Sequence, residues 1–162
     1  MISCSKLFKK SQKGFTLIEL LVVIGILAVL LSIVLIAINP ARQFAQANDT
    51  QRKSNVTAIL NAIGAYAADN HGTLPANMPV PADGAINIKS GAVGNKGDIC
   101  ADIMPTYISA LPQDPSSNNG AQITACAAYD TKYTVAVDAN KRVTVAATPD
   151  PAGTGQAITI TR

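Results

Sequence analysis

A chain of 162 residues is long enough for one compact domain, and less of it remains for that domain once a long apolar segment near the N-terminus is set aside. The formal net charge is +3, and four lysines lie in a short leader without acidic residues: Lys6, Lys9, Lys10 and Lys13. The rest of the chain therefore has no net positive charge, and it contains no tryptophan. Because a basic stripe with interleaved aromatic side chains is missing, we expect no direct nucleic-acid site.

The first predicted element is a membrane-spanning helix at residues 15–38. Only Thr16, Glu19, Gly25 and Ser32 in this range are not strongly apolar. As a helix the segment is about 36 Å long, enough to cross a hydrocarbon core of roughly 30 Å. It is too long for the apolar region of a secretory signal, and no small-x-small cleavage site follows it. The lysines before it favour a cytoplasmic N-terminus, although three basic residues follow on the far side: Arg42, Arg52 and Lys53.

Glu19 is the unexpected residue of this helix. A charged side chain near the centre of a bilayer costs about 2.5 to 3.5 kcal/mol, and the cost is smaller near a helix end. One explanation is that Glu19 extends to the headgroups. The other is that Glu19 pairs with a positive group, and cleavage between Gly14 and Phe15 would create an amine four residues before it. That pairing would be most useful between neighbouring molecules.

The stretch KGFTLIELLVVIGILAVL resembles the N-terminal signature of type IV pilins and the related pseudopilins. The resemblance implies cleavage after Gly14 by a membrane prepilin peptidase and methylation of the new Phe15 amine. It further implies storage in the cytoplasmic membrane, contact with an assembly platform there, and extraction into a helical filament on the cell surface. Glu19 corresponds to the glutamate with which this family recognises the N-terminus of the preceding subunit.

The charge of Glu19 has a physical purpose in such a filament. An unpaired carboxylate is costly in a core of packed apolar helices. Pairing Glu19 of one subunit with the Phe15 amine of the next removes that cost at one axial register only. Because this contact is head-to-tail, it produces an open polymer rather than a closed ring.

A break is predicted between residues 36 and 40, where Pro40 lacks an amide donor and Asn39 can cap a new helix. Beyond it, residues 39–72 predict an amphipathic helix that Gly72 ends. The apolar face is formed by residues spaced three and four apart: Phe44, Ala47, Gln51, Val56, Ile59, Leu60, Ile63 and Tyr66. We expect the upper half of this helix to pack on a sheet and the lower half to project.

Residues 73–162 predict a loop-rich β headpiece. A short AINIK strand stands alone in a region rich in proline, glycine, asparagine and aspartate. The clearest signal is a hairpin, with alternating apolar residues in 133–137 and 143–147 around a turn at 139–141. AITITR predicts a last strand. The fold class is therefore α+β: a basic leader at 1–14, then a long N-terminal helix packed on a small antiparallel sheet, as in type IV pilins.

Cys4 lies in the leader, which leaves Cys100 and Cys126 as a pair in an oxidising compartment. A bridge between them would stabilise a small domain by about 3 to 4 kcal/mol. Two buried free thiols are the alternative. A zinc site is not expected because the chain has one histidine, His71. The resemblance to pilins, many of which carry a disulfide, favours the bridge.

The stretch ISALPQDP resembles a segment near a calcium site in the major pseudopilins of type II secretion. Four residues could supply oxygen atoms to calcium, although they could equally be turn residues: Asp114, Asn118, Asn119 and Asp130. We expect no resident cofactor, with calcium as the weaker alternative.

The function expected first is that of a structural subunit of a type IV pilus, for adhesion, motility or DNA uptake. The alternative within the family is the major pseudopilin of a type II secretion system. From another class comes a membrane-anchored extracytoplasmic binding domain that does not polymerise. No phosphate-binding loop and no histidine with a nucleophilic partner is present, so we do not expect an enzyme.

Overall fold

The computed structural model describes residues 14–91, 93–153 and 155–162. The leader lysines and Cys4 lie outside these residues. The chain divides after Pro40 into two compact units, an N-terminal unit and a headpiece of residues 41–162.

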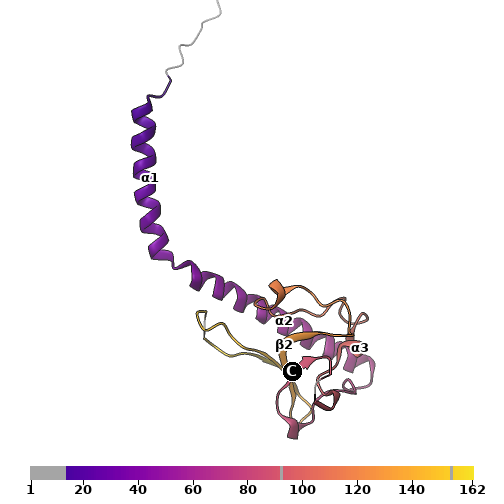
Figure 1. The fold of residues 1–162 in the computed structure, drawn as a ribbon. Helices are drawn as coiled ribbons and strands as arrows, with labels where there is room; N and C mark the ends of the chain where they lie inside the picture. The colour runs from indigo at the N-terminus through magenta and orange to yellow at the C-terminus, as the bar shows by residue number, and fades with distance from the viewer. Residues whose placement is uncertain (1–13, 92, 154) are drawn as a thin grey trace, which may run out of the picture. The chain divides into compact units, whose positions relative to one another are not determined.

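From Gly14 onward, the N-terminal unit is formed mainly by helix α1, at Leu17–Ile38, drawn in indigo in Figure 1. Thr16 is its N-cap residue. Apolar side chains cover every face of α1, and none of its residues is buried within the chain. A helix that is apolar all round is stable only in lipid or among other apolar helices. In the part of the chain that is described, α1 is also the one helix long and apolar enough to cross a membrane.

The break predicted near Pro40 is confined to one residue, Asn39. Its backbone is left-handed, with φ of 45° and ψ of 79°. Asparagine adopts this conformation more readily than most residues, and it commonly ends helices in this way. Helix α2 begins at once with Pro40, whose missing amide donor costs nothing at a first helical position.

Helix α2 runs over Pro40–Asp69, and Gly72, with φ of 82°, follows its last turn. Its buried residues are Ala45, Asp49, Arg52, Val56, Ile59, Leu60, Ala62 and Ile63. The expected upper face is confirmed at Ile59 and Ile63. The lower half was expected to project, and Phe44 is indeed 71% exposed, but the prediction is wrong for the neighbouring face, where the charged Arg52 is 4% exposed. The buried face starts instead at Ala45, because ion pairs with the headpiece satisfy the charges that it carries.

The headpiece sheet has four antiparallel strands in the order β1-β2-β3-β4. The strands are β1 Ile86–Lys89, β2 Asp130–Val137, β3 Val143–Ala147 and β4 Ile158–Thr161. Val135 pairs with Val145, and Val137 with Val143, which confirms the predicted hairpin. The predicted strands at 86–89 and 158–161 are confirmed as well, and with them the α+β fold class. Short helices lie between β1 and β2 or before β1: η1 Pro81–Asp83, η2 Val93–Asn95, α3 Cys100–Ile103 and η3 Asn118–Gly120.

One apolar core joins α2, the sheet and α3. Its largest fully buried side chains include Tyr133, Ile59, Ile63, Ile88, Ile99, Ile103 and Leu111. Tyr133 is buried although it carries a hydroxyl, because the Asn55 amide donates to that oxygen at 2.9 Å. Apolar contacts between α2 and the sheet are thus supplemented by this hydrogen bond.

Cys100 and Cys126 form a disulfide, with their Cα atoms 5.6 Å apart. The bridge resolves the choice between a disulfide and two free thiols. It ties α3, which belongs to the core, to the loop before β2. A long irregular stretch of the headpiece is therefore fixed at both ends.

Candidate functional site

The segment from Gly14 to Glu19 is the first candidate site. Gly14 and Phe15 precede the cap of α1 and are exposed. The Thr16 amide and the Thr16 hydroxyl both donate to Glu19 Oε2, each at 2.9 Å. In return the Glu19 amide donates to the Thr16 hydroxyl oxygen at 3.2 Å. This reciprocal pattern is a capping box.

The capping box changes how Glu19 is understood. From the sequence, the carboxylate was expected to reach the headgroups or to pair with an amine, most usefully on another molecule, whereas in the single chain it accepts from two donors of Thr16. The T-x-x-E spacing of a capping box is a recognisable sequence signal, and it was missed. Because the carboxylate bends back toward the start of α1, it lies on the side of the helix where cleavage after Gly14 would create the Phe15 amine.

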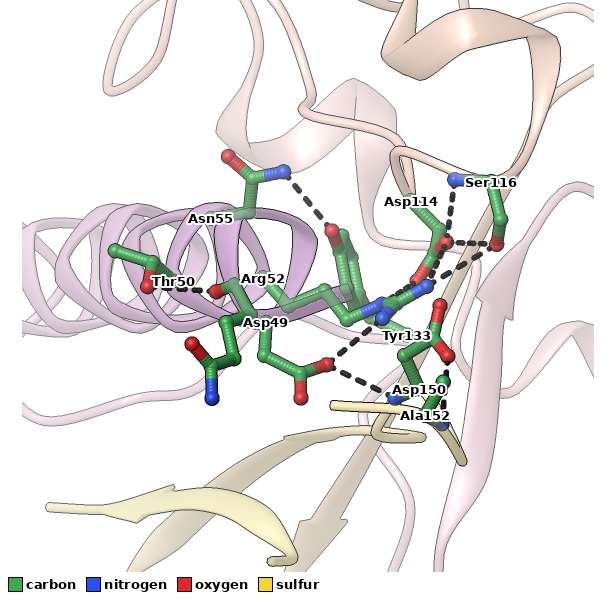
Figure 2. Close-up of polar contacts among 10 residues, drawn as sticks. Asp49, Thr50, Arg52, Asn55, Asp114, Ser116, Tyr133, Asp150 and Ala152 are labelled. Carbon is green, nitrogen blue, oxygen red and sulfur yellow. Dashed lines mark hydrogen bonds and ion pairs between the residues drawn. The ribbon is translucent and has the colours of Figure 1, made fainter. Parts of the chain in front are cut away.

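The second candidate site is a buried charge cluster on α2, shown in Figure 2. Arg52 Nε donates to Asp114 Oδ2 at 2.7 Å, and Arg52 Nη2 donates to Asp114 Oδ1 at 3.0 Å. Arg52 Nη1 donates to Asp49 Oδ1 at 2.9 Å. All three residues are buried: Asp49 and Arg52 are 4% exposed, and Asp114 is 5% exposed. Sequence reasoning missed this cluster, although Asp49, Arg52 and Val56 share one helical face at spacings of three and four.

The four calcium candidates do not form one set of ligands. Both oxygens of Asp114 accept from Arg52, and Oδ1 also accepts from the amide and the hydroxyl of Ser116. Asp130 is paired with Lys132 at 2.8 Å. Asn118 and Asn119 are exposed turn residues with φ of 47° and 53°. Among the described residues, no three histidine, cysteine, aspartate or glutamate side chains are placed to hold a metal ion.

The cluster shifts the pKa values of its members. Burial is the largest single influence on Asp114 and would raise its pKa, but the hydrogen bonds from Arg52 and Ser116 together outweigh it. The pKa of Asp114 is therefore lowered from 3.8. The pKa of Arg52 is raised, chiefly by its hydrogen bond to Asp114. Both residues are charged at neutral pH.

An acid-dependence experiment tests this pairing. Because the pKa of Asp114 is lowered on folding, its stabilising effect is complete above about pH 4 and is lost as the pH falls through the folded-state pKa. We expect Asp114→Asn to lower the free energy of unfolding by about 3 kcal/mol near neutral pH, since it removes one of the two carboxylates that pair with the buried Arg52. The variant should also lose less stability than the wild type on acidification. Urea unfolding followed by circular dichroism, at neutral pH and at an acidic pH below about 4, measures the two effects.

Asp138→Asn is the matched control, because Asp138 pairs with the exposed Arg142 at the surface. Exposed pairs contribute little, and asparagine keeps the oxygen that accepts from the Asn140 and Arg142 amides, so this variant should resemble the wild type near neutral pH. Equal loss of stability on acidification in the wild type and in Asp114→Asn would show that the Asp114 charge does not stabilise the fold.

Comparison with known proteins agrees with the geometry of the N-terminal segment. Residues 9–35 match the family described as "Prokaryotic N-terminal methylation motif". The chain is 32% identical over 114 residues to the type II secretion system core protein G of Aeromonas hydrophila. The aligned residues are 68% of this chain and 71% of that protein. No solved structure matches. The chain belongs to the family of type IV pilins and pseudopilins, structural subunits that polymerise through an apolar N-terminal helix.

Proposed function

We propose that the chain is a major pseudopilin, a structural and non-enzymatic subunit of a type II secretion system. The observation that carries the filament role is α1 itself: an apolar helix without a buried face, with one carboxylate held at its start. The likeness to core protein G supports the secretion role, because it extends over 114 residues, whereas the methylation motif covers residues 9–35.

The geometry supports a simple exchange during assembly. In the single chain the Thr16 amide and hydroxyl donate to Glu19. In the filament the Phe15 amine of the neighbouring subunit, cleaved and methylated but still positive, becomes the charged donor to that carboxylate. The amine brings a full positive charge to the carboxylate, which the neutral Thr16 donors do not, and this attraction is stronger among packed apolar helices than in water, so the exchange favours the assembled register.

The subunit occupies two locations in turn, one before and one after assembly. Before assembly the chain is a single-pass protein of the cytoplasmic membrane with its N-terminus inside. A prepilin peptidase cleaves after Gly14, and an assembly platform in the membrane extracts the subunit. After assembly the subunit lies in an extracytoplasmic filament, where copies of α1 replace lipid around one another.

The second candidate is the subunit of a type IV pilus for adhesion, motility or DNA uptake, predicted first from the sequence. The methylation motif is compatible with both. Deleting the gene in the source organism separates them. Loss of protein export with intact surface pili supports the pseudopilin, and loss of pili with intact export supports the pilus subunit.

Processing gives a direct prediction. Intact mass and N-terminal sequencing of the membrane-extracted protein should find a chain that begins at methylated Phe15. Gly14→Val should retain the leader, because a branched side chain would stand next to the scissile bond. Gly14→Ala, a smaller change, should be processed better than Gly14→Val. Wild-type protein that retains the leader in its own host would contradict prepilin processing.

A further inference from the structure

Two loops that are distant in the sequence are joined to α2 through Arg52 and its ion-pair partner Asp49. One contains Asp114 and Ser116, after the core residue Leu111. The other contains Asp150 and Gly153, between β3 and β4. We propose that Arg52 is the built-in cation of the headpiece, which attaches both loops to α2 so that the headpiece stays folded without a divalent metal ion.

The first loop is held by a bidentate contact between Arg52 and Asp114. The Nε and Nη2 groups of Arg52 meet the two oxygens of Asp114 at 2.7 and 3.0 Å, and Nη2 also donates to the Ser116 hydroxyl at 3.2 Å. The rigid fork of a guanidinium matches a carboxylate in this way, and a lysine ammonium does not. The contact therefore fixes both the position and the orientation of the loop.

The second loop is held through Asp49. Asp49 Oδ1 accepts from Arg52 Nη1 and from the Asp150 amide, both at 2.9 Å. Gly153 lies so close that a Cβ atom there would collide with the Asp49 carboxylate. Arg52 thus orients the carboxylate on which the second loop rests.

Burial makes the positive charge necessary. Asp49 is 4% exposed and Asp114 is 5% exposed, so two carboxylates that contact one guanidinium group are almost completely buried. A buried carboxylate without a partner is strongly destabilising. Arg52 neutralises this pair in the way that a bound cation would.

The calcium ion that the resemblance to pseudopilins implies for this loop does not fit these residues. Of its two candidate carboxylate ligands, Asp114 already accepts from Arg52 and Ser116, and Asp130 is paired with Lys132. The surface hollow beside the cluster is lined by a second cation, Lys132, which pairs with Asp130. A divalent ion would face two positive side chains at this place.

Thermal unfolding of the full chain in detergent, followed by near-ultraviolet circular dichroism, tests the proposal. We expect the wild-type Tm to be the same in excess EDTA and in millimolar calcium chloride. Arg52→Gln should lower the Tm by about 10 to 20 °C, because two buried carboxylates lose their cationic partner. The Tm of Arg52→Lys should lie between those of the wild type and Arg52→Gln, since lysine keeps the charge and loses the bidentate guanidinium.

Arg142→Gln is the matched control, because it removes an arginine whose pair with Asp138 is exposed, and its Tm should stay close to the wild-type value. A wild-type Tm that rises clearly with calcium and falls in EDTA would overturn the proposal. So would an Arg52→Gln Tm equal to that of the wild type. If Arg52→Gln does not fold, the wild-type metal dependence and Arg52→Lys still decide. Failure here leaves the filament role untouched, because the proposal concerns the headpiece alone.

Discussion

Replacing Cys126 by alanine is expected to lower the free energy of unfolding of the headpiece by about 3 to 4 kcal/mol. The bridge closes a loop with a sequence separation of 26, and a loop of this length gives that value on the chain-entropy model. Cys126 is the better position to change, because Cys100 is fully buried in the core and can remain there as a small apolar thiol. Urea unfolding of both proteins under oxidising conditions measures the difference.

Reduction provides the internal check. Dithiothreitol should lower the stability of the wild type to the level of Cys126→Ala and leave the variant unchanged. Cys4→Ala, which removes the leader cysteine, is the matched substitution and should have no effect on the headpiece. If Cys126→Ala is as stable as the oxidised wild type, the bridge does not hold the loop before β2.

The regular elements could be predicted because their residues follow simple periods. In the hairpin, Tyr133, Val135 and Val137 alternate with less buried neighbours, and this period of two occurs in strands. The break at Asn39 followed from the missing amide of Pro40. In both cases the signal lies within a few consecutive residues, so no knowledge of distant contacts was needed.

The lower half of α2 could not be predicted in the same way, because its buried face contains charge. Apolar periodicity selected Phe44, which is exposed, and passed over Arg52, whose partner Asp114 is 62 residues away. A charged residue is buried when a distant loop supplies its counter-ion, and the sequence does not state that pairing. The Asp49–Arg52 spacing was the only local signal, and such a spacing is equally common on exposed helix surfaces.

The calcium candidates failed as a set for a related reason. Asp114, Asn118, Asn119 and Asp130 are the residue types that coordinate calcium and also the types that form turns. Asn118 and Asn119 have left-handed backbones in the turn of η3, and the two aspartates face cations of the chain. Residue type alone does not separate calcium coordination from turn formation. The two uses are distinguished by the partner of each carboxylate in the folded chain.

Replacing Glu19 by glutamine is expected to abolish filament formation while leaving α1 intact. Glutamine can still accept the hydrogen bonds of the capping box with Thr16, so the start of the helix is preserved. The charge that pairs with the Phe15 amine of the next subunit is lost, and an amine left unpaired among packed apolar helices costs about 3 to 5 kcal/mol. That cost corresponds to a decrease of about two to three and a half orders of magnitude in the association constant of each subunit.

Thr16→Ala is the matched control for the cap. It removes the hydroxyl that donates to Glu19 and accepts from the Glu19 amide, but it keeps the carboxylate. Losing an N-cap side chain costs about 1 kcal/mol, so this variant should still form filaments, in reduced amount. Electron microscopy and immunoblotting of sheared filaments, with membrane-fraction blots for subunit level and processing, compare the variants. A filament yield for Glu19→Gln equal to that of the wild type would mean that Glu19 serves α1 as a helix cap alone, because glutamine preserves the cap and removes only the charge.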